Sequence, residues 1–480
     1  DALSLHTRMT PQAQAIGQDG SQDAVAAYLD GAALIKIAKE MHCDCIHPGY
    51  GFLSENANFA TMCAAEDIAF IGPSASALQL FGDKVTARAL AQSCGIPVVA
   101  GSTAALNSSS EAREIAHGIG YPVMLKAAAG GGGRGMRAVA SDDELADAFE
   151  RCQSEAAAAF GDGSIFIEKL VLRPRHIEVQ ILADTKGQTV HLHERDCSVQ
   201  IRNQKVIEIA PAAGLDPTLR QNMHDDAIKL AKAADYVNAG TVEFLVSPES
   251  GDYYFIECNP RIQVEHTVTE QVTGIDLVEA QFHIAGGASL ASLGLADQAA
   301  VGAARGYAVQ ARVVAQGSGT ISGYKEPSGP GIRVDACGYL GYTPPPQFDP
   351  LLAKLICTAR SGGTLVAAVE RTLAALDEFH IGGLPTNLAQ LRAILEKPEV
   401  GGGNARTSLM AEHPELSDIA GRQTGGEAVS FLEQQAATLI TPGAGQVRAQ
   451  FESNLPPLAI ADNATGLECP MAGSILELSL

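Results

Sequence analysis

The sequence is poor in several features that mark whole classes of protein. Its 480 residues include no tryptophan and only 5% aromatic side chains, and no apolar run reaches the roughly 18 residues that a membrane-spanning helix needs. Positive charge is also scarce, because 33 Lys and Arg residues stand against 55 Asp and Glu, which gives a net charge of -22. Such a chain repels polyanions. We therefore expect neither nucleic acid nor a membrane as a partner.

The spacing of the cysteines excludes two further classes. The ten cysteines include no Cys-x-x-Cys pair and show no regular spacing of the kind found in disulfide scaffolds or zinc sites. We interpret Cys43 and Cys45 as small apolar residues on one face of a buried strand. The chain starts at Asp1 with no Met and no signal core. A reducing compartment follows, which we expect to be the cytoplasm, or mitochondria if a transit peptide precedes Asp1.

Glycine is abundant instead. It accounts for 49 of 480 residues, or about 10%, against roughly 7% in average proteins. With 46% hydrophobic and 18% charged residues, the composition is that of a folded globular chain, and the length predicts about three domains. We expect several loops that are lined by backbone groups.

The N-terminal part shows alternating helix and strand patterns. Residues 24–41 and 56–66 read as helices, and residues 43–46 and 68–71 read as short strands. This alternation is typical of an α/β domain with a parallel sheet, whose ligand site lies at the carboxyl ends of the strands. The loop 47–54 would sit there.

Longer strands follow from about residue 83, in apparent antiparallel succession, which predicts an α+β domain. A third region, from about 306 to 414, combines strands with two helices around the turn at 382–385. The overall fold class is therefore α/β and α+β, with several domains. The strands that we expect cover residues 121–127, 165–170, 176–183, 189–195, 242–246, 253–258, 307–315, 332–336 and 351–359.

A glycine-rich loop is the strongest local motif. Residues 126–136 read Lys-Ala-Ala-Ala-Gly-Gly-Gly-Gly-Arg-Gly-Met, so a strand breaks into glycines and then resumes. Glycine lets backbone N–H groups approach a phosphate closely, and Lys126 and Arg134 add positive charge. The segment is neither a Walker A motif nor a dinucleotide fingerprint. A glycine-rich hairpin without a ligand is the alternative.

A second group of polar residues follows two apolar strands. Glu243, Glu257 and Asn259 supply the oxygen ligands that Mg²⁺ prefers. Beyond them, an Arg261 fork could clamp an oxyanion while Glu265 acts as a general base. The neighbouring cation Arg261 would hold the pKa of Glu265 low, so its basicity would have to come from geometry. A solvated charged strand is the alternative.

Several motifs together resemble one family. The segments 47–56 (His-Pro-Gly-Tyr-Gly-Phe-Leu-Ser-Glu-Asn), 82–84 (Gly-Asp-Lys), 130–136, 194–197 (Glu-Arg-Asp-Cys) and 261–266 (Arg-Ile-Gln-Val-Glu-His) are similar to the biotin carboxylase component of biotin-dependent carboxylases. The resemblance covers about residues 1–412. It implies an ATP-grasp ligase that uses ATP, bicarbonate and Mg²⁺ or Mn²⁺ to form carboxyphosphate and then carboxylates biotin, which is attached elsewhere and not within this chain.

The resemblance also assigns expected roles to individual positions. It implies a catalytic group in which Glu265 is the base, assisted by Lys205, Arg261 and Arg333. Bicarbonate and biotin contacts fall on Gln263, Val264 and Tyr50, and metal ligands on Glu243, Glu257 and Asn259. The expected nucleotide contacts are Lys84, Lys126, Gly130, Gly131, Gly132, Gly133, Gly135, Glu168, Lys169, His176, Gln200 and Leu384.

The family also implies domain boundaries. We expect an N-terminal domain at 1–82 that lacks its first βα unit, an ATP-grasp domain at 83–287 with a lid at about 98–170, a C-terminal domain at 305–412, a connector at 413–467 and the start of a biotinyl carrier domain at 468–480. The lysine that carries biotin would lie beyond Leu480. The implied partners are bicarbonate, a carrier domain, a carboxyltransferase region or subunit, and other copies of the chain.

Two other functions compete with this interpretation. The chain could be an inactive or fragmentary module that binds nucleotide or a carrier domain without turnover. A carbamoyl-phosphate synthase-type enzyme shares the ATP-grasp chemistry and the phosphorylation of bicarbonate. The set Lys126, Glu243, Glu257, Glu265 and Arg333 favours an enzyme over a scaffold, because a scaffold has no need for these groups.

Overall fold

The computed structural model describes residues 4–17, 24–102, 104–106, 108–127, 135–359 and 363–419. Its N-terminal part has the predicted alternation, with β1 and β2 paired in parallel. The elements are η1 (Leu5–Thr7), α1 (Ala24–Leu29), α2 (Gly31–Glu40), β1 (Cys45–Ile46), η2 (Phe52–Glu55), α3 (Ala57–Ala65), β2 (Ala69–Phe70) and α4 (Ala75–Gly82). The loop 47–54 follows β1, at the carboxyl end of that strand.

Two local expectations in this part are wrong. The segment 24–41 forms two helices, because the side chain of Asp30 accepts a hydrogen bond from the Ala33 N–H and so caps the start of α2. The strand that begins at Cys45 is shorter than predicted. As a result Cys43 is exposed and Cys45 is only partly buried, so they do not share a buried strand face.

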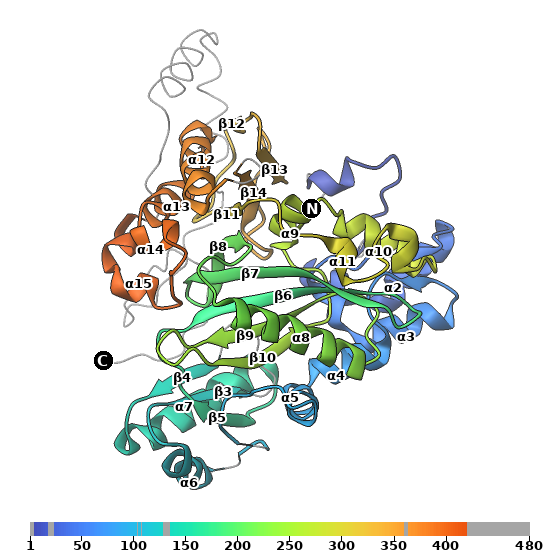
Figure 1. Cartoon of the computed structure of the whole chain (residues 1–480). Coiled ribbons are helices and arrows are strands. Elements are labelled where there is room, and N and C mark those ends of the chain that lie inside the picture. The colour runs from blue at the N-terminus through green and yellow to red at the C-terminus, as the bar shows by residue number, and fades with distance from the viewer. Residues whose placement is uncertain are drawn as a thin grey trace, which may run out of the picture. The chain divides into compact units, whose positions relative to one another are not determined.

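An eight-stranded antiparallel sheet forms the centre of the described chain, in the order β10-β9-β6-β7-β8-β11-β14-β13. Strands β11, β13 and β14 come from the C-terminal region, and β11 pairs with β8, so this region extends the central sheet, while its strands β12 and β15 form a separate two-stranded sheet. Helix α8 (Pro217–Ala233) packs on β6 and β7 (Figure 1). The strands are β6 (Arg175–Ala183), β7 (Thr189–Ile201), β8 (Gln204–Ala210), β9 (Asn238–Val246), β10 (Tyr253–Asn259), β11 (Ala308–Val314), β13 (Ile332–Ala336) and β14 (Leu351–Thr358).

A small three-stranded sheet, β4-β3-β5, flanks the glycine-rich segment. Strand β3 (Val123–Ala127) pairs antiparallel with β4 (Met136–Val139) and β5 (Ile165–Lys169). Helices α6 (Ser109–Ile119) and α7 (Asp142–Phe160) cover it (Figure 1). Three acidic residues in the first turn of α7 complement its dipole. The strand that resumes after the glycines is thus confirmed, while residues 128–134 lie outside the described part.

The remaining elements complete the hydrophobic cores. They are α5 (Lys84–Ser93), α9 (His266–Thr273), α10 (Leu277–Ala285), η3 (Leu290–Leu293), α11 (Gln298–Val301), β12 (Gly323–Lys325), α12 (Leu365–Glu378), β15 (His380–Gly382), α13 (Leu388–Leu395), α14 (Pro398–Gly401), α15 (Leu409–Glu412) and η4 (Pro414–Ile419). One core joins α12 and α13 to β11 and β14, and another joins α4, α5 and α8 to β6, β9 and β10. The two predicted helices around 382–385 are confirmed as α12 and α13.

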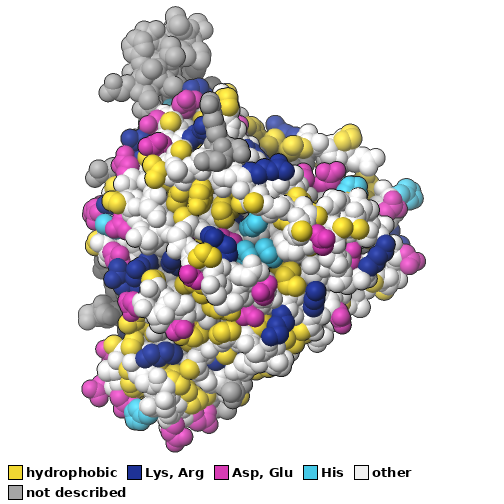
Figure 2. Space-filling view, viewed as in Figure 1, with side chains coloured by type: hydrophobic (Ala, Val, Ile, Leu, Met, Phe, Trp, Pro, Cys, Tyr) yellow, Lys and Arg dark blue, Asp and Glu magenta, His cyan; other side chains and the backbone are white. Residues whose placement is uncertain are grey.

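Surface charge is mixed on the face that Figure 2 draws, where acidic and basic side chains are interspersed. Within the described ranges, no helix is both long and apolar enough to cross a membrane. The cysteines that the structure describes are all free. The expected carrier-domain segment at 468–480, and all but the first residues of the connector, lie outside the described residues.

Candidate active site

Three glutamates stand in one row across neighbouring strands. Glu178 on β6 lies opposite Glu243 on β9, which lies opposite Glu257 on β10. Like charges directly opposite one another in a sheet repel, and Glu178 and Glu243 are almost completely buried. Burial of this much negative charge requires cations close by. The sheet register alone therefore indicates a site built for positive groups.

Lys205 supplies the central cation. Its Nζ lies 2.5 Å from Glu178, 2.8 Å from Glu243 and 2.8 Å from Glu265. Burial alone would lower the pKa of Lys205, but the three carboxylates raise it well above its ordinary value. The same contacts help to hold the pKa of Glu243 well below its ordinary value, against the effect of burial.

A tight hairpin places Lys205. Strand β7 ends at Ile201 and β8 begins at Gln204, and the two turn residues Arg202 and Asn203 both have positive φ, 51° and 64°. Such a two-residue turn matches the twist of the strands that it joins. Lys205 then pairs with Gln200 across the hairpin. Lys205 is therefore the second residue of β8, and the hairpin directs it toward the site.

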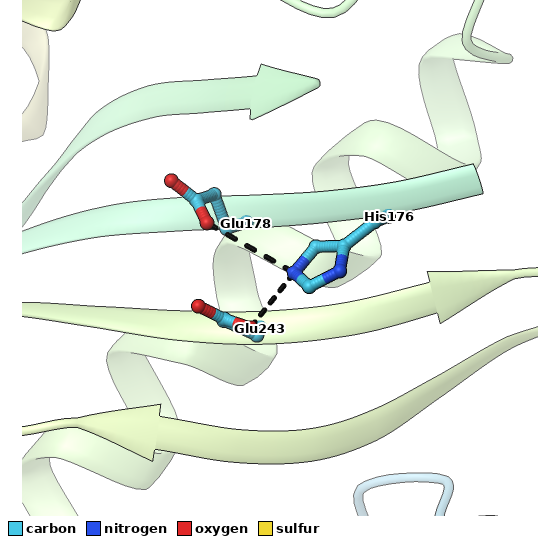
Figure 3. A group of neighbouring side chains, drawn as sticks. All are labelled: His176, Glu178 and Glu243. Carbon is cyan, nitrogen blue, oxygen red and sulfur yellow. Dashed lines mark ion pairs between the residues drawn. The ribbon is translucent and has the colours of Figure 1, made fainter. Parts of the chain in front are cut away.

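His176 extends the cluster along β6 (Figure 3). Its Nε2 lies 2.7 Å from Glu243 and 4.0 Å from Glu178, while its Nδ1 is 3.0 Å from the Gln200 side-chain amide. The close contact with Glu243 is an ion pair when the imidazole is protonated. Burial lowers the pKa of His176, but Glu243 more than compensates and the net direction is upward.

A second buried cation, Arg195, holds Glu178 and Gln263 in place by hydrogen bonds. Its side chain is 0% exposed and donates to Glu178 at 2.5 Å and to Gln263 at 2.9 Å. It also donates to Gln180, Thr241 and Thr269. Because a guanidinium is a rigid planar fork, these bonds fix the orientation of every partner. Gln263 in turn donates to Glu243 at 2.9 Å.

Glu265 lies just before α9 and has a cation on each carboxylate oxygen. Oε1 contacts Lys205, and Oε2 accepts a hydrogen bond from Arg312 Nη2 at 2.8 Å. Burial would raise the pKa of Glu265, but Lys205, Arg312 and Arg195 hold it well below its ordinary value. The pKa of Glu265 is therefore low, as expected, but the cations that lower it are not the expected one. The cations in contact with Glu265 are Lys205 and Arg312, not Arg261.

Arg261 is directed to a different group. Its Nε donates to Glu55 on η2 at 2.6 Å, and its Nη2 donates to the Asn259 side-chain oxygen at 3.2 Å. The amide nitrogen of Asn259 donates to Glu243 at 2.9 Å. Arg261 thus links the N-terminal region to the end of β10. Its position at the strand end agrees with the predicted placement, but its contact with Glu55 was not foreseen.

Arg333 projects from β13 between two carboxylates. It forms a bidentate pair with Asp335, at 2.8 and 2.9 Å, and donates to Glu270 on α9 at 2.7 Å.

Tyr50 is 41% exposed. Burial is the main cause that raises the pKa of its hydroxyl, the charge of Asp349 adds to the rise, and the charge of Arg312 opposes it.

The expected nucleotide residues form two connected groups. Asp83 caps α5, so Lys84 occupies the first helical position, where its Nζ lies 3.9 Å from Glu257. On the small sheet, the two oxygens of Glu168 on β5 are contacted by Lys126 of β3 and by Arg88 of α5. Burial raises the pKa of Glu168, but Lys126, Arg88 and Lys84 lower it, so the net direction is downward. Lys84 therefore lies close to both groups.

Other expected nucleotide residues lie differently. The Lys169 ammonium donates to the backbone carbonyls of Gly120 and Tyr121. Leu384 is 2% exposed and packs in the C-terminal core. Gly135 is described, with φ 69°, and the space beside its Cα is filled by Ala127. Gly130, Gly131, Gly132 and Gly133 lie outside the described residues.

The residues present fit a magnesium ion. Glu243 and Glu257 are opposite each other in register, and Asn259 follows on the same strand as Glu257. Their carboxylate and amide oxygens are hard donors, as Mg²⁺ requires. The Glu257 side chain is 38% exposed, so it can reach an ion that also contacts a phosphate.

The described ranges contain two groups of side chains that are close enough to share one metal ion. They are His176 with Glu178 and Glu243, and Glu178 with Cys197 and Glu265. Both surround the Lys205 ammonium, which already supplies their positive charge. The two histidines of β7, at 191 and 193, belong to neither group.

Comparison with known protein families decides the relationship. Residues 1–78 match the biotin carboxylase N-terminal domain, residues 83–293 the ATP-binding domain of the carbamoyl-phosphate synthase L chain, and residues 305–412 the biotin carboxylase C-terminal domain. Solved biotin carboxylases align over nearly their full length. The chain belongs to the biotin carboxylase family. The likeness to carbamoyl-phosphate synthase is limited to the ATP-binding domain, at residues 83–293.

Two solved members of the biotin carboxylase family illustrate the match. The biotin carboxylase domain of Hydrogenobacter thermophilus 2-oxoglutarate carboxylase, a dimer in complex with MgADP, ADP and bicarbonate, is 40% identical with a TM-score of 0.82, and the alignment covers 87% of this chain and 91% of that one. Biotin carboxylase from Campylobacter jejuni is 40% identical with a TM-score of 0.80, over 85% of this chain and 91% of that one.

Longer relatives contain a biotin carboxylase part. Pyruvate carboxylase of Schizosaccharomyces pombe is 44% identical over 428 residues, and mitochondrial pyruvate carboxylase of Homo sapiens is 46% identical over 428 residues. Each alignment covers 87% of this chain and 36% of the relative. The chain therefore spans about a third of the length of these curated relatives.

Proposed function

We propose that this chain catalyses the ATP- and bicarbonate-dependent carboxylation of biotin, by way of carboxyphosphate. The observation that carries the proposal is the position of Glu265, which is buried, ionised and held between Lys205 and Arg312. A carboxylate fixed in this way can accept a proton without first being positioned. The family relationship and the placement of the expected residues around it support this reading.

In the first step, Glu265 accepts the proton of bicarbonate. A bicarbonate oxygen then forms a bond to the γ-phosphorus of ATP, and the bond to the β-phosphate oxygen breaks, which releases ADP. Arg261, Gln263, Lys205 and the backbone at Val264 would bind the anion, because they converge around Glu243: Lys205 and Gln263 both donate to it, and Arg261 donates to Asn259, which also donates to it. The bound anion would compete with Glu265 for the Lys205 ammonium and so increase the basicity of Glu265.

On the nucleotide side, Lys84, Lys126, Glu168, Lys169, His176, Gln200 and Leu384 would contact ATP, with the segment Gly130–Gly135 closing over the phosphates. Glu243, Glu257 and Asn259 would hold Mg²⁺, whose charge would neutralise the phosphate oxygens. Phosphoryl transfer depends mainly on positioning and charge neutralisation, which these groups provide. Exclusion of water would protect the mixed anhydride.

In the second step, the ureido nitrogen of biotin forms a bond to the carboxyl carbon as the carbon–oxygen bond to phosphate breaks, and the departing phosphate takes the proton from that nitrogen. Arg333 would stabilise the negative charge on the ureido oxygen, and Tyr50 would border the biotin. We propose that biotin arrives on a carrier domain and that a carboxyltransferase region or subunit uses the product. Association with further copies of the chain, and a reducing compartment, cytoplasmic or mitochondrial, are part of the proposal.

The test compares ADP formation by the full chain with and without bicarbonate. We expect bicarbonate-dependent turnover in the wild type and its loss, by about 10²-fold or more, in Glu265→Gln. Glu279→Gln, an exposed glutamate on α10, is the matched control and should behave like the wild type. Normal bicarbonate-dependent turnover in Glu265→Gln would refute the assignment, and absence of ATP cleavage in the wild type would favour an inactive module.

A further inference from the structure

Lys354 is a largely buried lysine to which neither the sequence motifs nor the proposed function gives a role. It lies on β14, and its side chain is only 13% exposed. In the sheet register it stands directly between Arg312 on β11 and Asp335 on β13. Side chains in such a row project from the same face, with neighbouring strands about 4.8 Å apart. Lys354 therefore lies between the partner of Glu265 and the partner of Arg333.

The contacts of Lys354 join the two halves of the site. Its Nζ lies 3.3 Å from Asp335 Oδ2, the oxygen that also accepts from Arg333 Nη2 at 2.9 Å. The same ammonium donates to the Val264 carbonyl at 3.3 Å, next to Glu265. One cation thus contacts the carboxylate that orients Arg333 and the backbone that precedes the base.

The charges around Arg333 explain why a cation is needed at Lys354. Arg333 is paired with two carboxylates, Asp335 and Glu270, so these three groups alone carry a net charge of -1. A further negative charge developing near Arg333 would be repelled by this excess. Lys354 brings the group to neutrality. No excess negative charge then remains around Arg333 to repel an anion that forms beside it. Fixed charges of this kind act most strongly in partly buried sites.

We propose that Lys354 is a positioning residue for the biotin step: its ammonium neutralises the carboxylate pair that holds Arg333 and ties Asp335 to the Val264 carbonyl. The inference rests on the proposed function. It requires that loss of Lys354 weakens the step in which charge develops near Arg333 more than it weakens the phosphorylation of bicarbonate. A purely structural lysine would affect both steps alike.

The experiment measures two rates on the full chain, bicarbonate-dependent ADP formation without biotin and its stimulation by free biotin. Lys354→Met should lose biotin stimulation by at least about tenfold, while the rate without biotin changes less than about threefold. Lys354→Arg retains the charge and should keep most of the stimulation. Lys325→Met, an exposed lysine on β12, is the matched control and should match the wild type.

A second variant separates charge balance from packing. Asp335→Asn combined with Lys354→Met again gives a neutral group, so the double variant should recover part of the stimulation lost in Lys354→Met. Retained stimulation in Lys354→Met, or a double variant no better than the single one, would overturn the inference alone. A wild type without bicarbonate-dependent ATP cleavage would overturn the proposed function and the inference together.

Discussion

Replacement of Lys205 by methionine perturbs the centre of the site most sharply. The ammonium contacts Glu178, Glu243 and Glu265 within 2.8 Å, and methionine would fill a similar volume without charge. Three carboxylates would then share the remaining cations. We expect Lys205→Met to abolish turnover and also to destabilise the fold, because buried charges would lose their compensation.

The magnitude follows from the burial of the partners. The side chains of Glu178, Glu243 and Glu265 are at most 4% exposed. Removing one partner of a buried ion pair typically costs about 3–5 kcal/mol, since the other charge stays buried. For the compact unit of residues 1–426, this corresponds to a fall in melting temperature of roughly 4–6 °C.

The pH dependence should reverse sign. In the wild type, the pKa values of Glu243 and Glu265 lie below their ordinary value of 4.5, so their stabilisation is complete above pH 4.5 and is lost only in stronger acid. Without Lys205, burial acts against fewer cations and the folded pKa values rise. Protonation then relieves the repulsion, so the variant should gain stability as the pH falls from 7.5 to 5.5.

The pH dependence of the melting temperature is measured by thermal unfolding, followed by far-UV circular dichroism because the chain has no tryptophan for fluorescence. Lys186→Met, an exposed lysine after β6, serves as the control. We expect the Lys205→Met melting temperature to rise on acidification while those of the wild type and the control stay level or fall. An unchanged melting temperature at pH 7.5, or the same pH slope as the wild type, would refute the electrostatic reasoning.

Three further predictions concern stability. Arg195→Met should lower the free energy of unfolding by about 3–5 kcal/mol, measured by urea denaturation, because the buried partners of Arg195 lose their donors. Gly383→Ala should destabilise by about 1–3 kcal/mol, seen as a lower thermal midpoint, because φ is 93° and the new Cβ would lie 2.0 Å from the Thr320 carbonyl oxygen. Glu194 has a pKa of about 2, since a hydrogen bond from His224 and nearby cations outweigh burial. The stability difference between the wild type and Glu194→Gln should therefore shrink as the pH falls from 4.5 towards 2.

Local patterns in the sequence predict much of the fold. The strands around Glu243 and Glu257 follow from apolar alternation, and the start of β4 at Met136 follows from the end of the glycine-rich segment. The family motifs predict the placement of Glu265 and Lys205 together. Helix ends are harder to predict from the sequence, because a single capping contact of Asp30 divides the first predicted helix into two.

Contacts that depend on long-range register could not be foreseen. Arg312 reaches Glu265 only because β11 pairs with β8 and brings a residue of the C-terminal region beside the base. Nothing local in the sequence around 312 signals this pairing. The pairing of Arg261 with Glu55 joins residues 206 positions apart. Such partners are selected by the tertiary fold, so sequence reasoning chose the nearest cation, Arg261.

The most direct test of the account is the transfer of labelled carbon from bicarbonate to free biotin by the full chain. The account predicts acid-labile labelled carboxybiotin that forms only when ATP and Mg²⁺ are present and that disappears in Glu265→Gln. ATP cleavage that is indifferent to bicarbonate, or labelled product that forms equally well in Glu265→Gln, would contradict it.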